Sequence, residues 1–189
     1  MSDVDGRRVL VIGAGRSGVA AARALLRHAA VVTVAESGPS VAARSAMAAL
    51  RDEGARTVVD ITGTSAVAFD LIVPSPGVPE HHPLLEAAAV AGVEVWSEPE
   101  LAWRLAGGRT QLVAVSGTNG KTTTTELLAA CLDAPAGGNI GTPLVTLLEQ
   151  SPPPLVVAEL SSFQLRFTQT LRPRVAVLLN VAPDHLDWH

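Results

Sequence analysis

The chain has 189 residues, of which 48% are hydrophobic and 17% are charged, and it carries a formal net charge of −4. This composition supports a packed core in one large domain or two small ones, argues against intrinsic disorder, and lacks the basic charge that nucleic-acid-binding proteins usually carry. The N-terminus has no signal-peptide pattern and no apolar run is long enough to span a membrane, so we expect a cytoplasmic protein without nucleic-acid or membrane partners. We also expect a monomer.

The first segment of the chain matches the dinucleotide-binding fingerprint. An apolar run at residues 8–12 precedes the sequence Gly13-Ala-Gly-Arg-Ser-Gly18, an alanine-rich stretch then predicts a helix to about His28, and residues 31–35 predict a strand that ends in Glu36. In this pattern the glycines permit a tight turn, a close approach of backbone to phosphate and close helix packing, and the acidic residue binds a sugar hydroxyl or a base edge. The open alternative is a strand-to-helix turn whose glycines serve packing alone.

Strands and helices continue to alternate up to Ser97. Helices are expected at residues 41–50 and 84–91, and strands at residues 57–61, 69–73 and 93–96. A proline-rich turn follows the second of these strands, so Ser75 and Gly77 either face a ligand crevice at the carboxyl edge of the sheet or belong to a plain rigid loop. The alternation predicts an α/β fold with a Rossmann-like, doubly wound parallel sheet, and a boundary that divides the chain into residues 1–97 and 98–189.

A phosphate-binding loop is the strongest feature of the second half. Residues 112–115 predict a buried strand, and Gly117-Thr-Asn-Gly-Lys-Thr122 leads into a helix that begins near Lys121, the only lysine of the chain. Free N–H groups and the positive end of the helix dipole favour a phosphate chain there, with Lys121 on the outer phosphates and Thr122 on Mg²⁺. Val115 replaces the first glycine of the strict P-loop pattern, so a glycine-rich turn without a ligand is the alternative.

The stretch after this helix is rich in glycine and proline. Cys131, near the end of the helix, is expected to be buried. Residues 133–141 predict a loop in which Asn139 either adopts an unusual backbone conformation or presents its amide to a ligand. Residues 142–150 predict a further helix.

Two later strands are expected to carry polar side chains to the edge of the same sheet. Residues 155–158 predict a core strand followed by Glu159, a carboxylate suited to Mg²⁺, and residues 175–179 predict a strand that leads to His185. Because the carboxyl ends of parallel strands lie at one edge of a sheet, these side chains predict a magnesium–nucleotide site near Lys121. The alternative for Glu159 is a solvated residue at a strand end.

Three motifs of the second half resemble those of the Mur ligase family. They are Ser116-Gly-Thr-Asn-Gly-Lys-Thr-Thr123, Glu159-Leu-Ser-Ser-Phe-Gln-Leu165 and Asn180-Val-Ala-Pro-Asp-His-Leu-Asp187. The fingerprint at Gly13–Gly18 and the Ser75-Pro-Gly77 turn agree with the same family. The second motif is typical of the family members that add D-glutamate.

The resemblance implies an ATP- and Mg²⁺-dependent ligase of peptidoglycan precursor synthesis, with a Rossmann-like substrate domain followed by a truncated P-loop ATPase-type domain. Such an enzyme joins D-glutamate to UDP-N-acetylmuramoyl-L-alanine through an acyl phosphate. Because family members are longer and carry a carbamylated lysine beyond the position of His189, we expect an incomplete fragment that binds the UDP-linked substrate weakly and does not complete ligation. The alternatives are an NAD(P)-dependent oxidoreductase and a non-catalytic nucleotide-binding remnant.

The resemblance also implies roles for individual residues. The expected ATP-binding residues are Gly117, Thr118, Asn119, Gly120, Lys121, Thr122 and Thr123. The expected metal ligands are Thr122, Glu159 and His185, and the expected catalytic residues are Lys121 and His185. The residues expected to hold the UDP-linked substrate are Arg16, Ser17, Glu36, Ser75, Pro76, Gly77 and Asn139.

Overall fold

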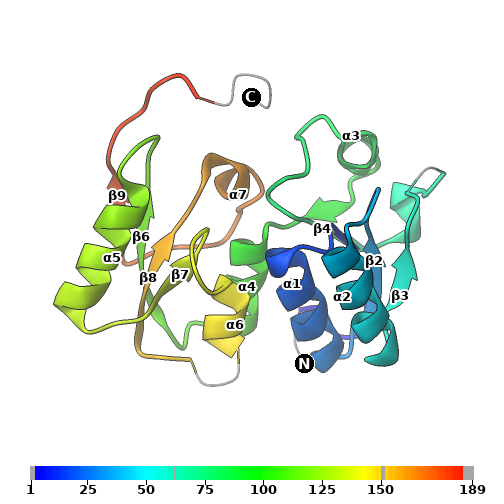
Figure 1. Cartoon of the computed structure of the whole chain (residues 1–189), viewed down its shortest axis with the longest axis horizontal. Coiled ribbons are helices and arrows are strands. Elements are labelled where there is room, and N and C mark those ends of the chain that lie inside the picture. The colour runs from blue at the N-terminus through cyan, green and yellow to red at the C-terminus, as the bar shows by residue number, and fades with distance from the viewer. Residues whose placement is uncertain (1–2, 62, 150–151, 185–189) are drawn as a thin grey trace. The chain divides into compact units, whose positions relative to one another are not determined.

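The computed structural model describes residues 3–61, 63–149 and 152–184. The chain divides into two compact units, Met1–Glu98 and Pro99–His189, and each unit contains its own parallel sheet (Figure 1). The division lies one residue after the boundary expected from the sequence. The α/β class and the parallel sheets predicted from the alternation of elements are confirmed. Within the described ranges, no helix combines the length and the apolar character needed to cross a bilayer.

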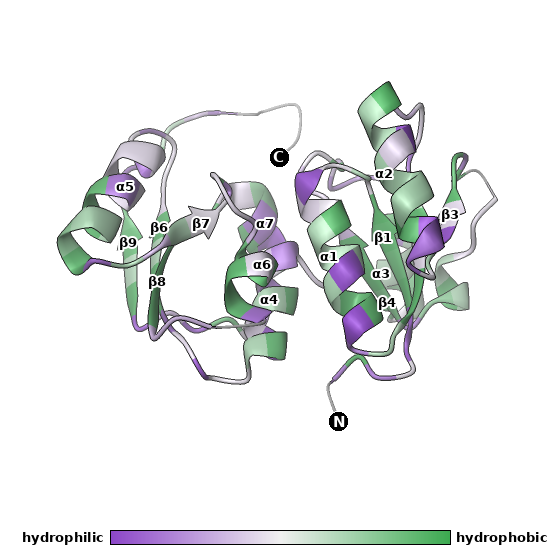
Figure 2. Ribbon diagram, turned by 60° about the horizontal axis from the view of Figure 1, so that its bottom comes forward, coloured by the Kyte–Doolittle hydropathy of each residue, from purple (hydrophilic) through white to green (hydrophobic). Residues whose placement is uncertain are grey.

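The first unit has a five-stranded sheet with the order β3-β2-β1-β4-β5. Its strands are β1 (Arg8–Ile12), β2 (Val31–Ala35), β3 (Arg56–Val58), β4 (Leu71–Pro74) and β5 (Glu94–Val95). Its helices are α1 (Arg16–Arg27), α2 (Val41–Asp52), α3 (Pro83–Ala91) and the short 3-10 helix η1 (Ala66–Ala68). The central strands β1 and β4 are apolar on both faces, as expected for inner strands of a parallel sheet (Figure 2).

Local sequence signals set the helix ends of this unit. The Ser40 hydroxyl accepts a hydrogen bond from the N–H of Ala43 at 3.1 Å and begins α2. Pro83 occupies the first turn of α3, and Gly92 ends that helix with a left-handed φ of +67°. These helix boundaries therefore follow from residues that are visible in the sequence.

Strand β4 begins two residues later than the sequence predicted. The N–H of Arg8 donates to the Asp70 carboxylate at 2.9 Å, and the Arg8 guanidinium donates to the same carboxylate at 2.7 Å. The Asp70 carboxylate thus accepts the hydrogen bond that the Arg8 N–H would otherwise donate to a strand carbonyl. The β1–β4 ladder therefore begins with the pairing of Val9 and Leu71. The expected strand at residues 57–61 is also shorter, because β3 ends at Val58.

The second unit has a four-stranded sheet with the order β7-β8-β6-β9. Its strands are β6 (Gln111–Ser116), β7 (Ala136–Gly138), β8 (Leu155–Glu159) and β9 (Val175–Leu178). Its helices are α4 (Glu98–Ala106), which begins at the division, α5 (Lys121–Leu132), α6 (Leu144–Glu149) and α7 (Ser162–Arg166). Buried valines of β6 and β8 pack with Ala129 of α5 to form a core cluster.

Strand β7 lies where the sequence predicted a loop. A Cβ atom at Gly137 would lie 2.5 Å from the Thr142 carbonyl oxygen, and one at Gly138 would lie 2.5 Å from the Glu159 carbonyl oxygen. The two glycines therefore allow β7 to approach β8 closely, a use of glycine that composition does not distinguish from a turn. The expectation that Cys131 is buried was wrong, because this side of α5 is exposed.

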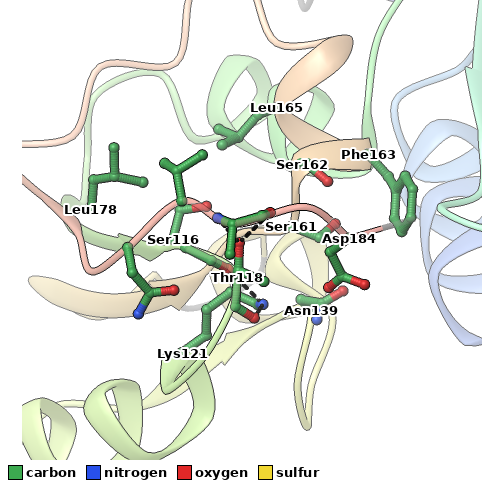
Figure 3. A pocket seen from close by; sticks show the side chains of 14 residues that line it. Ser116, Thr118, Lys121, Asn139, Ser161, Ser162, Phe163, Leu165, Leu178 and Asp184 are labelled. Atoms are coloured by element: carbon green, nitrogen blue, oxygen red, sulfur yellow. Dashed lines mark hydrogen bonds between the residues drawn. The ribbon is translucent and has the colours of Figure 1, made fainter. Parts of the chain in front are cut away.

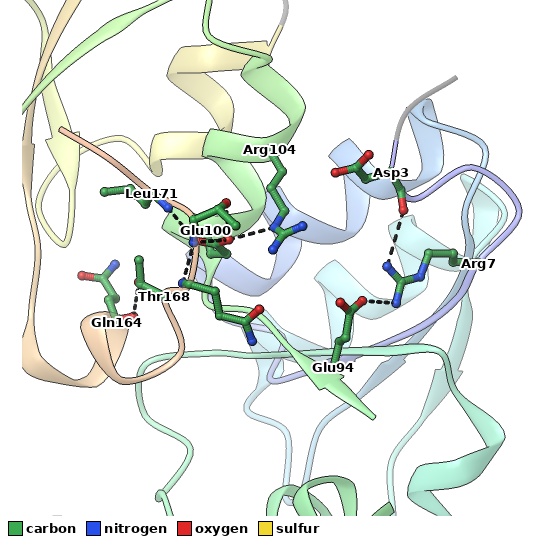
Figure 4. A network of polar contacts seen from close by, with 10 residues as sticks. Asp3, Arg7, Glu94, Glu100, Arg104, Gln164, Thr168 and Leu171 are labelled. Carbon is green, nitrogen blue, oxygen red and sulfur yellow. Dashed lines mark hydrogen bonds and ion pairs between the residues drawn. The ribbon is translucent and has the colours of Figure 1, made fainter. Parts of the chain in front are cut away.

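A buried carboxylate joins α4 to the chain that follows α7. Glu100 is fully buried and accepts hydrogen bonds from the N–H groups of Gln169, Thr170 and Leu171 at 2.9–3.0 Å (Figure 4). Arg104 donates to the same carboxylate at 2.8 Å. Burial by itself would raise the pKa of Glu100, but the hydrogen bonds from Thr170, Gln169 and Arg104 together lower it below its ordinary value. Glu100 therefore stays ionised and anchors the segment between α7 and β9.

Candidate functional site

The glycine-containing loop between β6 and α5 has the geometry of an anion-binding turn. Gly117 has a φ of +140° and Gly120 a φ of +83°, both in the region that favours glycine. Gly120 is the N-cap of α5, and no side chain caps this helix at that residue. The N–H groups of the first turn and the helix dipole are therefore available to an anion, as the phosphate-loop interpretation requires.

Lys121 folds back over this loop. Its ammonium group donates to the carbonyl oxygens of Gly117 at 2.7 Å and Thr118 at 2.9 Å (Figure 3). The side chain is half-buried and lines a pocket of about 360 Å³. The pocket also takes side chains from the start of α7 and from the segment after β9. A fixed positive charge thus lies beside the uncapped helix start.

Glu159 lies beside the loop, as the sequence predicted. The hydroxyl of Thr122 donates to Glu159 Oε2 at 2.8 Å, and the amide of Asn139 donates to Glu159 Oε1 at 2.7 Å. The backbone N–H of Asn139 also donates to the Glu159 carbonyl at 2.9 Å. Only 1% of Glu159 is exposed, so it is not the solvated strand-end residue considered as the alternative.

These oxygen donors fit a magnesium ion. Carboxylate and hydroxyl oxygens are hard ligands, and Mg²⁺ is usually bound by one or two protein oxygens together with phosphate oxygens and water. Among the described residues, the side-chain partners of Glu159 are the uncharged groups of Thr122 and Asn139, so a cation would not have to displace a lysine or an arginine. No group of three or more histidine, cysteine, aspartate or glutamate side chains suited to a metal occurs within the described ranges. The candidate protein ligands there are Thr122 and Glu159.

His185, expected to be catalytic and a metal ligand, lies outside the described residues. Its two roles stay predictions. The described segment after β9 extends to Asp184, which lines the same pocket as Lys121.

In the first unit, most of the residues expected to bind the UDP-linked substrate lie at the carboxyl edge of the sheet. The strands β1 and β4 pair side by side, so the turn after Ile12 and the turn after Pro74 are neighbours. Arg16 and Ser17 begin α1, and Ser75, Pro76 and Gly77 follow β4. Asn139 belongs to the second unit, where its side-chain amide donates to Glu159.

Glu36 and Ser75 both face the glycine turn of the fingerprint. The N–H of Ala14 donates to Glu36 Oε2 at 2.8 Å. A Cβ atom at Gly13 would lie 2.5 Å from the Ser75 hydroxyl oxygen, and one at Gly18 would lie 2.9 Å from it. The Ser75 hydroxyl is buried and forms no hydrogen bond with the described residues. Gly13 and Gly18 therefore permit close packing against Ser75, and Glu36 is bonded to the backbone of the same turn.

The sequence interpretation gave no role in the site to two parts of the second unit. One is α7, whose start is fixed by a capping box in which Ser161 and Gln164 bond each other's backbone N–H groups. The pattern Ser-x-x-Gln at residues 161–164 is the signal that identifies this helix start. The other is Asn180, which follows β9 and bonds the phosphate loop. An asparagine directly after a strand is too common in turns to have revealed that contact.

Both halves of the chain match models of known protein domains. A model of the Mur ligase MurD-like N-terminal domain matches residues 7–97, and a model of the Mur ligase middle domain matches residues 115–189. The UDP-N-acetylmuramoylalanine–D-glutamate ligase of Frankia casuarinae is 53% identical over 192 residues, which cover 97% of this chain and 40% of the relative. The ligase of the same name from Thermobifida fusca is 45% identical over 195 residues, which cover 99% of this chain and 42% of the relative.

A solved structure shares the fold. The UDP-N-acetylmuramate:L-alanyl-gamma-D-glutamyl-meso-diaminopimelate ligase from Neisseria meningitides superimposes with a TM-score of 0.55 at 24% identity, over 97% of this chain and 63% of that chain. The chain spans about 40% of the length of the curated relatives it matches. None of these matches supports the NAD(P)-dependent oxidoreductase considered as an alternative. With the family's N-terminal and middle domain models matching residues 7–97 and 115–189, the chain belongs to the Mur ligase family.

Proposed function

We propose that this chain forms part of an ATP-dependent ligase that joins D-glutamate to UDP-N-acetylmuramoyl-L-alanine. The observation that carries the proposal is the hydrogen bond between Thr122 and the buried Glu159, next to the uncapped start of α5 and the Lys121 ammonium group. This arrangement combines donors for phosphate oxygens with oxygen ligands for Mg²⁺. The two substrates are those in the names of the relatives from Frankia casuarinae and Thermobifida fusca.

In the proposed reaction, the terminal carboxylate of the UDP-linked substrate attacks the γ-phosphorus of ATP, and ADP leaves. The amine of D-glutamate then attacks the acyl carbon, loses a proton and displaces inorganic phosphate. The first step brings a carboxylate against a triphosphate, so charge neutralisation and alignment are the main demands on the protein. Mg²⁺, when bound, would neutralise and align the phosphate oxygens.

The residues of this chain would meet those demands as follows. The N–H groups at the start of α5 would bind phosphate oxygens, and Lys121 would place its positive charge on the β- and γ-phosphates. Thr122 and Glu159 would hold Mg²⁺. The Lys121 ammonium group donates to two loop carbonyls, so it already lies against the loop. On nucleotide binding it would donate to phosphate oxygens in place of these carbonyls.

The first unit would bind the UDP-linked substrate. Its polar residues at the carboxyl edge of the sheet include Glu36 and the buried hydroxyl of Ser75, and both face the glycine turn. In open parallel sheets, ligands bind outside this edge, and the turn after the first strand accepts a diphosphate. The proposed ligand of this turn is a uridine diphosphate rather than a nicotinamide cofactor.

The Lys121→Ala variant tests the phosphate site. Loss of one charge-assisted contact should weaken MgATP binding about 5- to 150-fold in isothermal titration calorimetry. The Arg174→Ala variant removes an exposed positive charge from the same unit and should bind MgATP as the unaltered chain does. An unchanged affinity in the Lys121→Ala variant would refute the phosphate-loop assignment.

A further inference from the structure

The segment that follows β9 is hydrogen-bonded along the phosphate loop. The N–H of Leu179 donates to the Ser116 carbonyl at 3.0 Å, and the N–H of Thr118 donates to the Asn180 carbonyl at 3.1 Å. Farther along, the Thr118 hydroxyl accepts from the N–H of Ala182 at 3.0 Å and lies 3.2 Å from the Ala182 carbonyl, to which it donates. The loop is therefore attached on one side to a segment about sixty residues later in the sequence.

The side chain of Asn180 completes this attachment. The N–H of Asn119 donates to Asn180 Oδ1 at 2.9 Å, and Asn180 Nδ2 donates to the Asn119 carbonyl at 3.0 Å. One side-chain amide thus satisfies both backbone polar groups of one loop residue. Gly117 packs against the same residue, because a Cβ atom there would lie 3.1 Å from the Asn180 carbonyl oxygen.

The residue bonded in this way lies between the two glycines of the loop that have positive φ. Asn119 lies between Thr118 and Gly120, and the loop contains glycines with positive φ at residues 117 and 120. Glycine restricts the backbone least, so the loop sequence by itself does not define one conformation. Gly120 is the N-cap of α5, so a rotation at Asn119 would redirect the N–H groups that face a phosphate.

We propose that Asn180 is a positioning residue for phosphate binding: its amide holds the Asn119 backbone and thereby keeps the loop in the conformation that accepts the triphosphate. This inference rests on the proposed function. Asn180 acts through Asn119 and stabilises the loop before the nucleotide arrives, which reduces the ordering cost of binding.

Two variants at this position separate hydrogen bonding from space filling. Asn180→Ala removes the amide and its volume, and Asn180→Leu keeps a side chain of similar size without polar groups. Both variants should bind MgATP about tenfold more weakly than the unaltered chain in calorimetry, since each loses two hydrogen bonds to the loop. In both, the amide proton of Asn119 should exchange at least about tenfold faster by NMR, because its acceptor is absent.

The Val175→Ala variant is the matched control. Val175 lies at the start of β9 and is 49% exposed, so this change removes a partly exposed apolar side chain from the same strand without touching the loop. It should leave both the MgATP affinity and the Asn119 exchange rate unchanged.

The remaining outcomes are distinct. MgATP binding by Asn180→Leu equal to that of the unaltered chain would overturn the positioning role. So would weaker binding with unchanged exchange at Asn119, because the effect would then not pass through that residue. Failure of the unaltered chain itself to bind MgATP would overturn the proposed function, and the inference with it.

Discussion

Glu159 is the residue on which the second-unit site depends. Its side chain is buried and accepts hydrogen bonds from two neutral groups, the Thr122 hydroxyl and the Asn139 amide. A buried charge held by neutral donors costs free energy that a packed apolar side chain would not, unless a cation binds. The position of this carboxyl group, bonded to Thr122 beside the uncapped start of α5, is what motivates the proposed metal and phosphate site.

The Glu159→Gln variant should reduce the effect of Mg²⁺ on ATP affinity. Glutamine keeps the size of the side chain but removes the charge that would attract the cation. We expect Mg²⁺ to raise the ATP affinity of the unaltered chain and to raise that of the variant several-fold less, as measured by titrations with and without Mg²⁺. The same Mg²⁺ effect in both proteins would exclude Glu159 as a metal ligand.

Asp70 provides a pH dependence in the first unit. Hydrogen bonds from the Arg8 side chain and backbone lower the pKa of Asp70 from 3.8 to about 2. Because the folded-state pKa is depressed, the stabilisation from this pair is complete above about pH 4 and is lost as the pH falls toward 2. An NMR titration should place the Asp70 midpoint near the lower value. The Asp70→Asn variant should unfold with a weaker pH dependence between pH 4 and pH 2.

At the scale of elements, α1 and the turn before it depend on how closely they approach β4. A Cβ atom at Gly18 would overlap the Gly13 carbonyl and lie 2.9 Å from the Ser75 hydroxyl oxygen, whereas one at Gly15 would meet nothing within 4 Å. Gly15 also has an ordinary negative φ of −76°. Two glycines of one motif thus have different functions: Gly18 serves packing, and Gly15 leaves the backbone open to a ligand.

The matched pair Gly18→Ala and Gly15→Ala tests this difference. Gly18→Ala should lower the free energy of unfolding by about 1–3 kcal/mol, because the added methyl group meets backbone that cannot move aside. Gly15→Ala, at the N-cap of α1, should cost less stability than Gly18→Ala but weaken binding of UDP-N-acetylmuramoyl-L-alanine in calorimetry, because the methyl group occupies the place where a diphosphate would approach. Equal stability of the two variants would contradict the packing role of Gly18.

At the scale of the whole molecule, both units use the same arrangement. Each has a parallel sheet and collects polar side chains at the carboxyl edge, after β1 and β4 in one unit and after β6 and β8 in the other. Parallel strands place all their carboxyl ends at one edge, so residues far apart in sequence meet there. Cytoplasmic location and a monomeric state stay predictions from composition and resemblance.

Much of this fold could be predicted from the sequence because its signals are local. Apolar runs identified β1, β2, β6 and β8, Ser40 marked the start of α2, and the glycine motifs marked both βα turns. The proximity of Glu159 to Thr122 could also be inferred, since the carboxyl ends of parallel strands lie at one edge of the sheet whatever the strand order. These features depend on residue type and spacing over a few positions.

Other features arose only from contacts between distant segments. Strand β7 forms because Gly137 and Gly138 permit close pairing with β8. From the sequence alone, the same two glycines predicted a loop. Glu100 anchors the chain after α7 through backbone N–H groups about seventy residues away, which carry no sequence signal. The Asn180 attachment is of the same kind.

The sequence by itself determined the two parallel sheets, the two glycine turns and the residue types gathered at each sheet edge, because periodicity and backbone preference act within a few residues. The tertiary structure alone decided that Asn139 bonds Glu159 and that Asn180 holds Asn119. The physical reason is that a hydrogen bond requires two groups within about 3 Å, and only the packing of the strands brings such distant residues that close.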